Sequence, residues 1–126
     1  MGQGYLIDSN AIIDFFNYSL PKAGIELLLT IEPRISIITQ IEVFSKRGLE
    51  EEEIKTLKEF INTALVYLVD EKVAAKAIDI RLEHNIKLPD AIIAATAICY
   101  NLILVTRNVS DFKRIKELEI IDPYTI

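Results

Sequence analysis

Short apolar segments that alternate with helical segments constrain the fold of this chain more than any other feature. Five such segments, rich in Ile, Leu, Val and Tyr, cover residues 4–7, 35–38, 66–69, 102–105 and 119–121. Strands that are apolar at nearly every position are typical of a sheet with both faces covered. Because helical segments separate these strands, the pattern predicts a mostly parallel sheet between two helical layers. We therefore expect an α/β fold, a three-layer α/β/α sandwich with a short sheet of four to five strands.

The segments between the strands carry the start and stop signals of helices. Apolar residues at helical spacing predict helices over residues 11–16, 39–47, 50–64, 71–84 and 89–100, and a further helix that opens at Pro21. Gly48 suits a helix end, and Pro89 suits the first residue of a helix. The helix over residues 89–100 is apolar on almost every side, so we expect it to be buried.

Length and composition indicate one globular unit. The chain has 126 residues, of which 51% are hydrophobic and 26% are charged. This composition excludes a disordered or low-complexity chain, and we expect a single domain over residues 1–126. The longest apolar stretch, residues 91–105, is shorter than the roughly 20 residues that cross a bilayer, so no membrane partner is expected. Cys99 is the lone cysteine, which suits a reducing cytoplasm.

The charge balance neither indicates nor excludes an RNA partner. The net charge is −5, which argues against a simple basic clamp for nucleic acid. A run of four acids at residues 50–53 accounts for most of the excess, as a favourable first helical turn would. Basic residues remain clustered at Lys46 and Arg47 and at Lys113, Arg114 and Lys116, where they either meet an RNA backbone or form solvated helix faces.

Four carboxylates lie at or near predicted helix starts. Asp8 and Asp111 follow the first and fourth strands, Glu42 follows the second, and Asp90 opens the buried helix. In a parallel sheet, ligands bind beyond the carboxyl ends of the strands. Like charges held close together raise one another's pKa, and a divalent cation relieves that repulsion. Oxygen ligands suit Mg2+ and Mn2+, so the acids together favour a metal site.

Each acid also has a purely structural explanation. Thr39 and Glu42 have the spacing of a capping box, in which the glutamate satisfies a backbone donor. Asp8 suits an N-cap, and Asp90 and Asp111 complement helix dipoles. Any one of these acids taken alone is explained well in this way. Their shared position after the strands favours a common site.

Several motifs resemble those of the PIN-domain family, and of VapC-type toxin ribonucleases in particular. Asp8-Ser9-Asn10 is similar to the family's opening motif, and residues 87–97, KLPDAIIAATA, closely resemble the helix that carries its third acid. Residues 106–112, TRNVSDF, resemble its last motif. Glu42 stands at the position of the second acid, and the match runs from Tyr5 to about Ile121.

The resemblance implies a metal-dependent endoribonuclease, the toxin of a type II toxin–antitoxin system. It implies that Asp8, Glu42, Asp90 and Asp111 bind Mg2+ or Mn2+ and that a metal-activated water attacks an RNA phosphodiester. Supporting or phosphate-contacting roles are implied for three further residues, which are Ser9, Thr106 and Asn108. A small antitoxin protein and a homodimer are the partners that it implies.

Other functions are compatible with parts of the sequence. A PIN-type nuclease of RNA processing without an antitoxin would carry the same acids, and a non-catalytic PIN-fold binding module would not need them all. A phosphoacceptor receiver domain fits poorly, because the chain after Val69 and Ile121 lacks its characteristic residues. His84 is the lone histidine, which excludes a paired-histidine mechanism. Arg81 faces either the acids or solvent.

Overall fold

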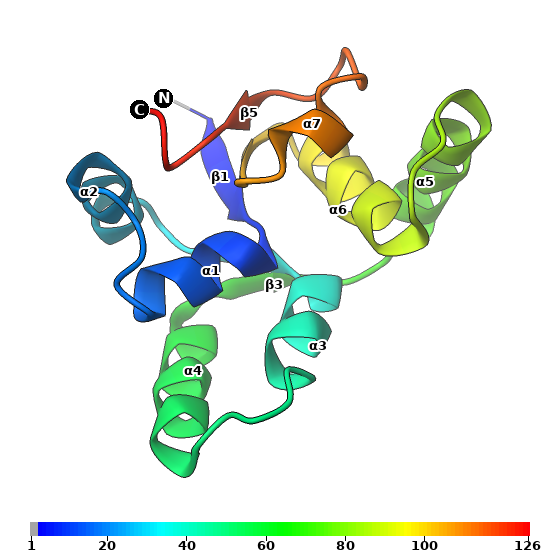
Figure 1. Cartoon of the computed structure of the whole chain (residues 1–126). Coiled ribbons are helices and arrows are strands. Elements are labelled where there is room, and N and C mark those ends of the chain that lie inside the picture. The colour runs from blue at the N-terminus through cyan, green and yellow to red at the C-terminus, as the bar shows by residue number, and fades with distance from the viewer. Residues whose placement is uncertain (1–2) are drawn as a thin grey trace.

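Strands and helices alternate along the chain as the apolar pattern predicts. The computed structural model describes residues 3–126. The strands are β1 (Gly4–Ile7), β2 (Arg34–Ser36), β3 (Leu65–Tyr67), β4 (Leu102–Val105) and β5 (Ile120–Ile121). The helices are α1 (Ser9–Phe16), α2 (Lys22–Thr30), α3 (Ile37–Phe44), α4 (Glu51–Thr63), α5 (Glu71–Glu83), α6 (Leu88–Cys99) and α7 (Val109–Phe112). Figure 1 shows these helices arranged around the strands.

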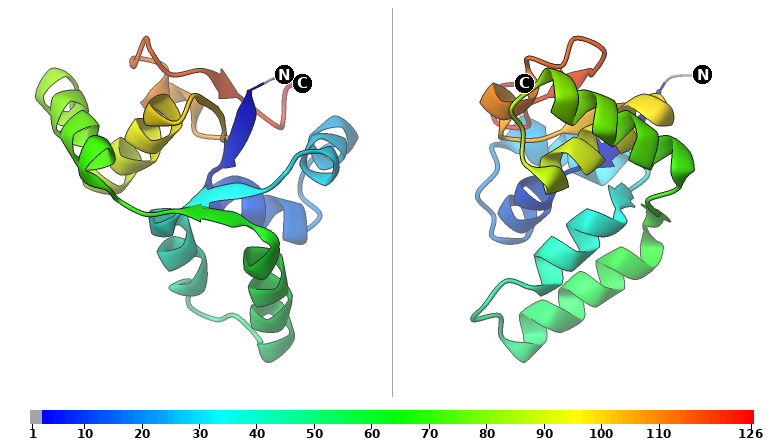
Figure 2. Two further views of the ribbon diagram at one scale, coloured as in Figure 1. Left: turned by 180° about the vertical axis from the view of Figure 1, so that it is seen from behind. Right: turned by 90° about the vertical axis from the view of Figure 1, so that its right-hand side faces the viewer.

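All strand pairs are parallel, and they form two hydrogen-bonded sets. One set has the order β1-β4-β5, and the other pairs β2 with β3. The two sets meet where β1 contacts β2, so the strands lie in the order β3-β2-β1-β4-β5. In Figure 2 the β2–β3 pair runs across the direction of β1, as in a strongly twisted sheet. The chain moves outward from β1 to β3 and then returns to β4, so the connection direction reverses between β1 and β4.

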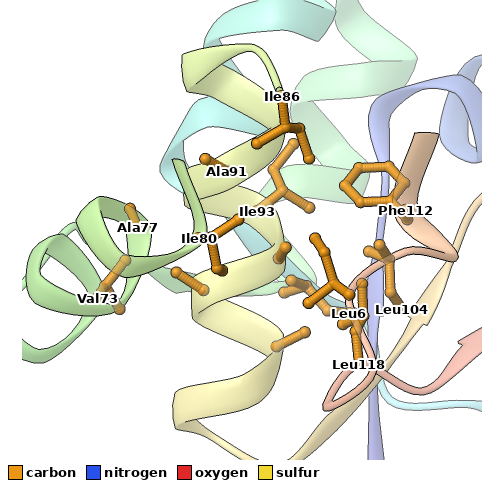
Figure 3. Packing of buried hydrophobic residues seen from close by; sticks show 14 of the residues in the cluster. Leu6, Val73, Ala77, Ile80, Ile86, Ala91, Ile93, Leu104, Phe112 and Leu118 are labelled. Carbon is orange, nitrogen blue, oxygen red and sulfur yellow. The ribbon is translucent and has the colours of Figure 1, made fainter. Parts of the chain in front are cut away.

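One hydrophobic core lies on the face of the sheet that α5, α6 and α7 cover. Leu6 of β1 and Leu104 of β4 point to this face and pack with Ile93 of α6 and Phe112 of α7. Figure 3 shows these side chains converging between α6 and the strands. Small residues of α6 allow this close packing, and they are fully or almost fully buried: Ala91, Ala94, Ala95 and Ala97. The buried helix is therefore confirmed.

A second hydrophobic core covers the opposite face. The next residue of each central strand, Ile7 of β1 and Val105 of β4, packs here with Ile12 of α1, Val43 of α3 and Leu57 of α4. Successive side chains of a strand point to opposite faces. Both faces of β1 and β4 are therefore buried, which explains why these strands are apolar throughout and confirms the three-layer α/β/α arrangement.

The second strand is shorter than the sequence predicts, and the helix after it begins earlier. The β-branched run over residues 35–38 suggested a strand, but β2 ends at Ser36. The Ser36 hydroxyl accepts a hydrogen bond from the backbone N–H of Ile38 (3.1 Å), so Ser36 is the N-cap of α3. The predicted helix start at Thr39 is therefore wrong.

Other boundaries differ by a few residues. The third strand ends at Tyr67, and the predicted strand residues Leu68 and Val69 are exposed. Helix α6 begins at Leu88, so Pro89 is its second residue and not, as the sequence predicts, its first. The short helix α7 lies where the sequence predicts a helix start near Asp111, but its four residues are too few to show a periodicity from which bounds could be predicted. No helix within residues 3–126 is both long and apolar enough to cross a membrane.

Candidate active site

The parallel pairing of β1 and β4 brings Asp8 and Thr106 together. Ile7 and Val105 are partners in the register, so the next residue of each strand leaves the sheet at the same edge. The Asp8 N–H donates to the Val105 carbonyl oxygen (2.9 Å), and the Thr106 N–H donates to that of Ile121 (3.1 Å). This edge is where the connection direction reverses, the usual position of a ligand site in such sheets.

Asp8 is a buried carboxylate held by three hydrogen bonds. It is 4% exposed, and its Oδ2 accepts from the Thr106 hydroxyl (2.8 Å) and from Nδ2 of Asn10 (3.2 Å). Its Oδ1 accepts from the backbone N–H of Ser9 (2.8 Å), which makes Asp8 the N-cap of α1 as the structural explanation proposed. Burial raises the pKa of Asp8, and the hydrogen bonds oppose that rise without cancelling it.

Glu42 reaches the same edge from α3. The Ser9 hydroxyl donates to its Oε1 (3.1 Å), which ties the start of α1 to α3. Partial burial raises the pKa of Glu42; the Ser9 hydrogen bond opposes that rise, and the charges of Asp8 and Asp90 add to it. The capping box with Thr39 is wrong, because α3 begins at Ile37 and Glu42 lies past its first turn.

Asp90 lies in the first turn of α6 and is half-buried. Burial raises its pKa most, and the charges of Asp8 and Asp111 raise it further, while Lys87 lowers it. The carboxylates of α1, α3, α6 and α7 thus act on one another electrostatically. This mutual repulsion is what separates a shared acidic site from independent helix caps.

Asp111 is exposed on α7, and the loop that precedes this helix positions it. Nδ2 of Asn108 donates to Asp111 Oδ2 (2.8 Å), and the Asn108 N–H donates to the Thr106 hydroxyl (3.0 Å). Phe112, the next residue, is completely buried and fixes α7 to the core. Thr106 therefore links Asp8 to the loop that carries Asp111.

Several residues that support this site were not predicted from the sequence. Asn10 donates to Asp8 and also to the Thr106 hydroxyl (3.3 Å), and its Oδ1 accepts from the N–H of Arg107 (3.1 Å). Its place two residues after Asp8 in the opening motif was the signal available. Asp14 accepts hydrogen bonds from the Arg107 side chain and from the Tyr124 hydroxyl, and no local sequence pattern marks Asp14 or Tyr124.

Arg81, whose orientation the sequence left open, and Cys99 both have defined contacts. Nε of Arg81 donates to the carbonyl oxygen of Ile86 (3.3 Å), so this side chain holds the turn that precedes α6. Cys99 packs against the core, and its thiol donates to the Lys72 carbonyl oxygen (3.6 Å).

The donor set suits a hard divalent cation. The converging side chains supply carboxylate, hydroxyl and amide oxygens. Burial first and the neighbouring acids second raise the pKa values of Glu42 and Asp90, and a cation would relieve the part that comes from the neighbouring acids. Within residues 3–126, no three acidic, histidine or cysteine side chains are close enough to enclose an ion by themselves. A cation here would therefore complete its coordination with water or phosphate oxygens, as Mg2+ commonly does.

The family follows from the sequence as a whole. The family model for the PIN domain matches residues 5–118, a span that contains all four acids. The chain belongs to the PIN domain family. The predicted membership is confirmed, and so is the fold expected of a PIN domain.

One relative of this PIN domain is named as a ribonuclease. A protein of Rickettsia bellii named Ribonuclease VapC is 39% identical over 90 residues, which cover 67% of this chain and 64% of that protein. The match thus spans slightly less than two thirds of that relative's length.

Solved structures of other PIN-like chains are similar over nearly the whole length. A chain of a toxin–antitoxin complex from Klebsiella pneumoniae has a TM-score of 0.79 and 30% identity, with 98% of this chain and 100% of that chain covered. A chain of DNA-bound VapBC from Salmonella typhimurium has a TM-score of 0.82 and 26% identity, with 96% and 98% covered.

Proposed function

We propose that this PIN domain is a metal-dependent endoribonuclease that hydrolyses RNA phosphodiester bonds as the toxin of a toxin–antitoxin pair. The observation that carries the proposal is the convergence of acids at the strand edge, where Thr106 and Asn108 link Asp8 to Asp111, Ser9 links the start of α1 to Glu42, and the charges of Asp8 and Asp111 act on Asp90. A catalytic metal site explains why a fold would hold such an unfavourable set of charges together. The name of the Rickettsia bellii relative, Ribonuclease VapC, supports the same activity.

Asp8, Glu42, Asp90 and Asp111 are the residues to which we assign the binding of Mg2+ or Mn2+. When bound, such a cation lowers the pKa of a water nucleophile and neutralises charge on the phosphate. The residues around it keep the carboxylates in place: Thr106 and Asn10 hold Asp8, Ser9 holds Glu42, and Asn108 holds Asp111.

Thr106 and Asn108 then have different tasks. Thr106 is fully buried and its hydroxyl donates to Asp8, so we assign it an orienting role and no contact with the phosphate. Asn108 is partly exposed and its amide reaches Asp111, so it is placed to orient that acid and to face a substrate.

We propose two protein partners. The similar chain from Klebsiella pneumoniae was solved within a toxin–antitoxin complex, which supports a small antitoxin as partner of this chain too. A homodimer is supported by an apolar patch on α5 and α6, whose exposed members are Ile78, Leu82 and Leu88 together with Val69 from the segment that precedes α5. We also propose a cytoplasmic location, since the free thiol of Cys99 suits a reducing compartment.

Incubation of the purified protein with a pool of structured RNAs tests the activity. Parallel reactions contain Mg2+, Mn2+ or excess chelator, and the products are resolved on a denaturing gel. We expect cleavage with either cation and none with chelator. Intact RNA in all three reactions would contradict a nuclease, and RNA binding in a separate mobility-shift assay would then favour a non-catalytic binding module.

A further inference from the structure

Arg107 occupies the middle of the loop that joins β4 to the acid-bearing helix α7. Its neighbours on either side serve the site directly, because Thr106 donates to Asp8 and Asn108 donates to Asp111. The backbone N–H of Arg107 donates to Oδ1 of Asn10 (3.1 Å), and Asn10 in turn donates to Asp8. The position of Arg107 therefore affects Asp8 and Asp111 together.

The side chain of Arg107 extends to an anchor on the second turn of α1. Its Nη1 donates to Oδ2 of Asp14 (3.0 Å), and the hydroxyl of Tyr124 donates to the same oxygen (2.9 Å). Asp14 is only 8% exposed. A carboxylate buried to this degree is costly unless it is paired, so the guanidinium and the phenol together make its burial tolerable.

The chain that carries Tyr124 is itself held firmly. Ile120 and Ile121 of β5 pair with Leu104 and Val105 of β4. Beyond them, Pro123 packs directly on Gly24 of α2, where an added Cβ would lie 2.2 Å from the Pro123 carbonyl oxygen. The Tyr124 hydroxyl is therefore presented to Asp14 from a fixed segment, and α1, the β4–α7 loop and the C-terminal segment meet at one buried carboxylate.

We propose that Asp14, with Arg107 and Tyr124, is a positioning group that holds the β4–α7 loop in the conformation needed to bind the cation. It contacts neither the cation nor the RNA, and it acts through Asn10, Thr106 and Asn108. This inference rests on the proposed nuclease function, since it assigns a role in that site. Outer groups that orient metal ligands commonly contribute about 10- to 100-fold to metal affinity or activity.

Asp14→Asn is the central test, because it removes the charge but leaves the guanidinium of Arg107 in place. Mn2+ affinity is measured by electron paramagnetic resonance, and amide hydrogen exchange is measured on the metal-free protein. We expect Mn2+ affinity and kcat to fall about tenfold while KM changes little. The amides of Arg107 and Asn108, bonded to Asn10 and Thr106, should exchange faster than in the wild type.

Further variants separate positioning from general damage. Tyr124→Phe removes one of the two donors to Asp14 and should give a smaller effect in the same direction. Arg107→Met should lower Mn2+ affinity at least as much as Asp14→Asn, and Arg107→Lys should restore part of it. The matched control is Lys76→Met, which breaks a remote surface ion pair with Glu117 (2.7 Å) and should leave Mn2+ affinity unchanged.

The opposing account makes Arg107 a direct ligand of the RNA phosphate. It predicts that Arg107→Met raises KM, whereas Asp14→Asn frees the guanidinium and leaves Mn2+ affinity and loop exchange unaltered. That result would overturn the proposal, as would wild-type Mn2+ affinity in both Asp14→Asn and Tyr124→Phe. If Asp14→Asn does not fold, the Mn2+ affinity and amide exchange of Tyr124→Phe decide between the two accounts. If the wild type does not cleave RNA, the proposed nuclease function is contradicted but the positioning role is not, because Mn2+ affinity and amide hydrogen exchange still test that role.

Discussion

At the residue scale, the site depends on how each carboxylate is solvated. Asp8 has almost no contact with water and relies on Thr106, Asn10 and the Ser9 N–H. Asp90 is half-buried, and the charges of Asp8 and Asp111 raise its pKa beyond the effect of burial. Asp8 is thus both a structural cap and a proposed ligand, whereas the ionised form of Asp90 costs the metal-free protein free energy.

Asp8→Asn should abolish most of the RNA cleavage. The amide keeps the shape of the side chain but removes the charge that binds the cation. Loss of a group that supports charge stabilisation in the transition state typically costs on the order of 10²- to 10⁴-fold in rate. Initial rates of cleavage in saturating Mg2+ measure this effect, with a melting curve to establish that the variant is folded. A folded variant with wild-type rates would remove Asp8 from the catalytic site.

Asp90→Asn should stabilise the metal-free protein at neutral pH. The folded-state pKa of Asp90 lies above its ordinary value of 3.8, so the unfolded chain loses this proton first as pH rises. Between the two pKa values the folded state binds more protons, and stability therefore falls with rising pH. The amide removes this cost, and the advantage of the variant should grow as pH rises above about 4 and become constant once the pH exceeds the folded-state pKa.

Thermal melts of the wild type and of Asp90→Asn, in chelator and in Mg2+, check this prediction. The stabilisation by Mg2+, which follows RT ln(1 + [L]/Kd), should shrink in the variant. The matched control is Asp79→Asn, the same chemical change at an exposed position of α5. A variant that melts lower than the wild type in chelator, with an unaltered response to Mg2+, would make Asp90 a structural acid.

At the scale of elements, the start of α3 decides where Glu42 lies. Ser36 caps this helix, and Glu42 is therefore free to meet Ser9. Ser36→Ala should lower the free energy of unfolding by about 1 kcal/mol, since it removes a side-chain cap.

Glu42→Gln in chelator should not lower the free energy of unfolding, because the pKa of Glu42 is raised in the folded state. Urea denaturation measures both; a loss in Glu42→Gln as large as that in Ser36→Ala would restore a capping role for Glu42.

At the scale of the whole molecule, the apolar patch on α5 and α6 favours self-association. Leu82 is 81% exposed and Ile78 is 60% exposed, and Leu88 begins the helix that carries Asp90. We expect a homodimer through this patch, and Leu82→Glu should dissociate it by placing a charge in an apolar contact. Light scattering at micromolar concentration measures the mass, with Tyr18→Glu, at an exposed residue outside the patch, as the control. A wild type with only a 14.3 kDa species would contradict the dimer.

Local sequence pattern was enough to predict the layered fold and the approximate position of the acids. Apolar runs identified the strands because burial on both faces leaves no polar positions, as Leu6 and Ile7 illustrate. Parallel pairing then requires residues that follow neighbouring strands to share one edge. This explains why Asp8 could be placed at the strand edge from local pattern alone. The resemblance of the motifs added the order of the acids.

The residues that hold those acids could not be predicted from local pattern, because they come from distant parts of the chain. Arg107 and Asp14 are 93 residues apart, and Tyr124 and Asp14 are 110 residues apart. No periodicity or spacing encodes such contacts, because each depends on two elements packing against a third. The start of α3 was predicted wrongly for a related reason. A β-branched run favours a strand locally, whereas the Ser36 cap and the packing of Val43 favour a helix. Local pattern fixes the elements, and packing fixes the partners of each polar group.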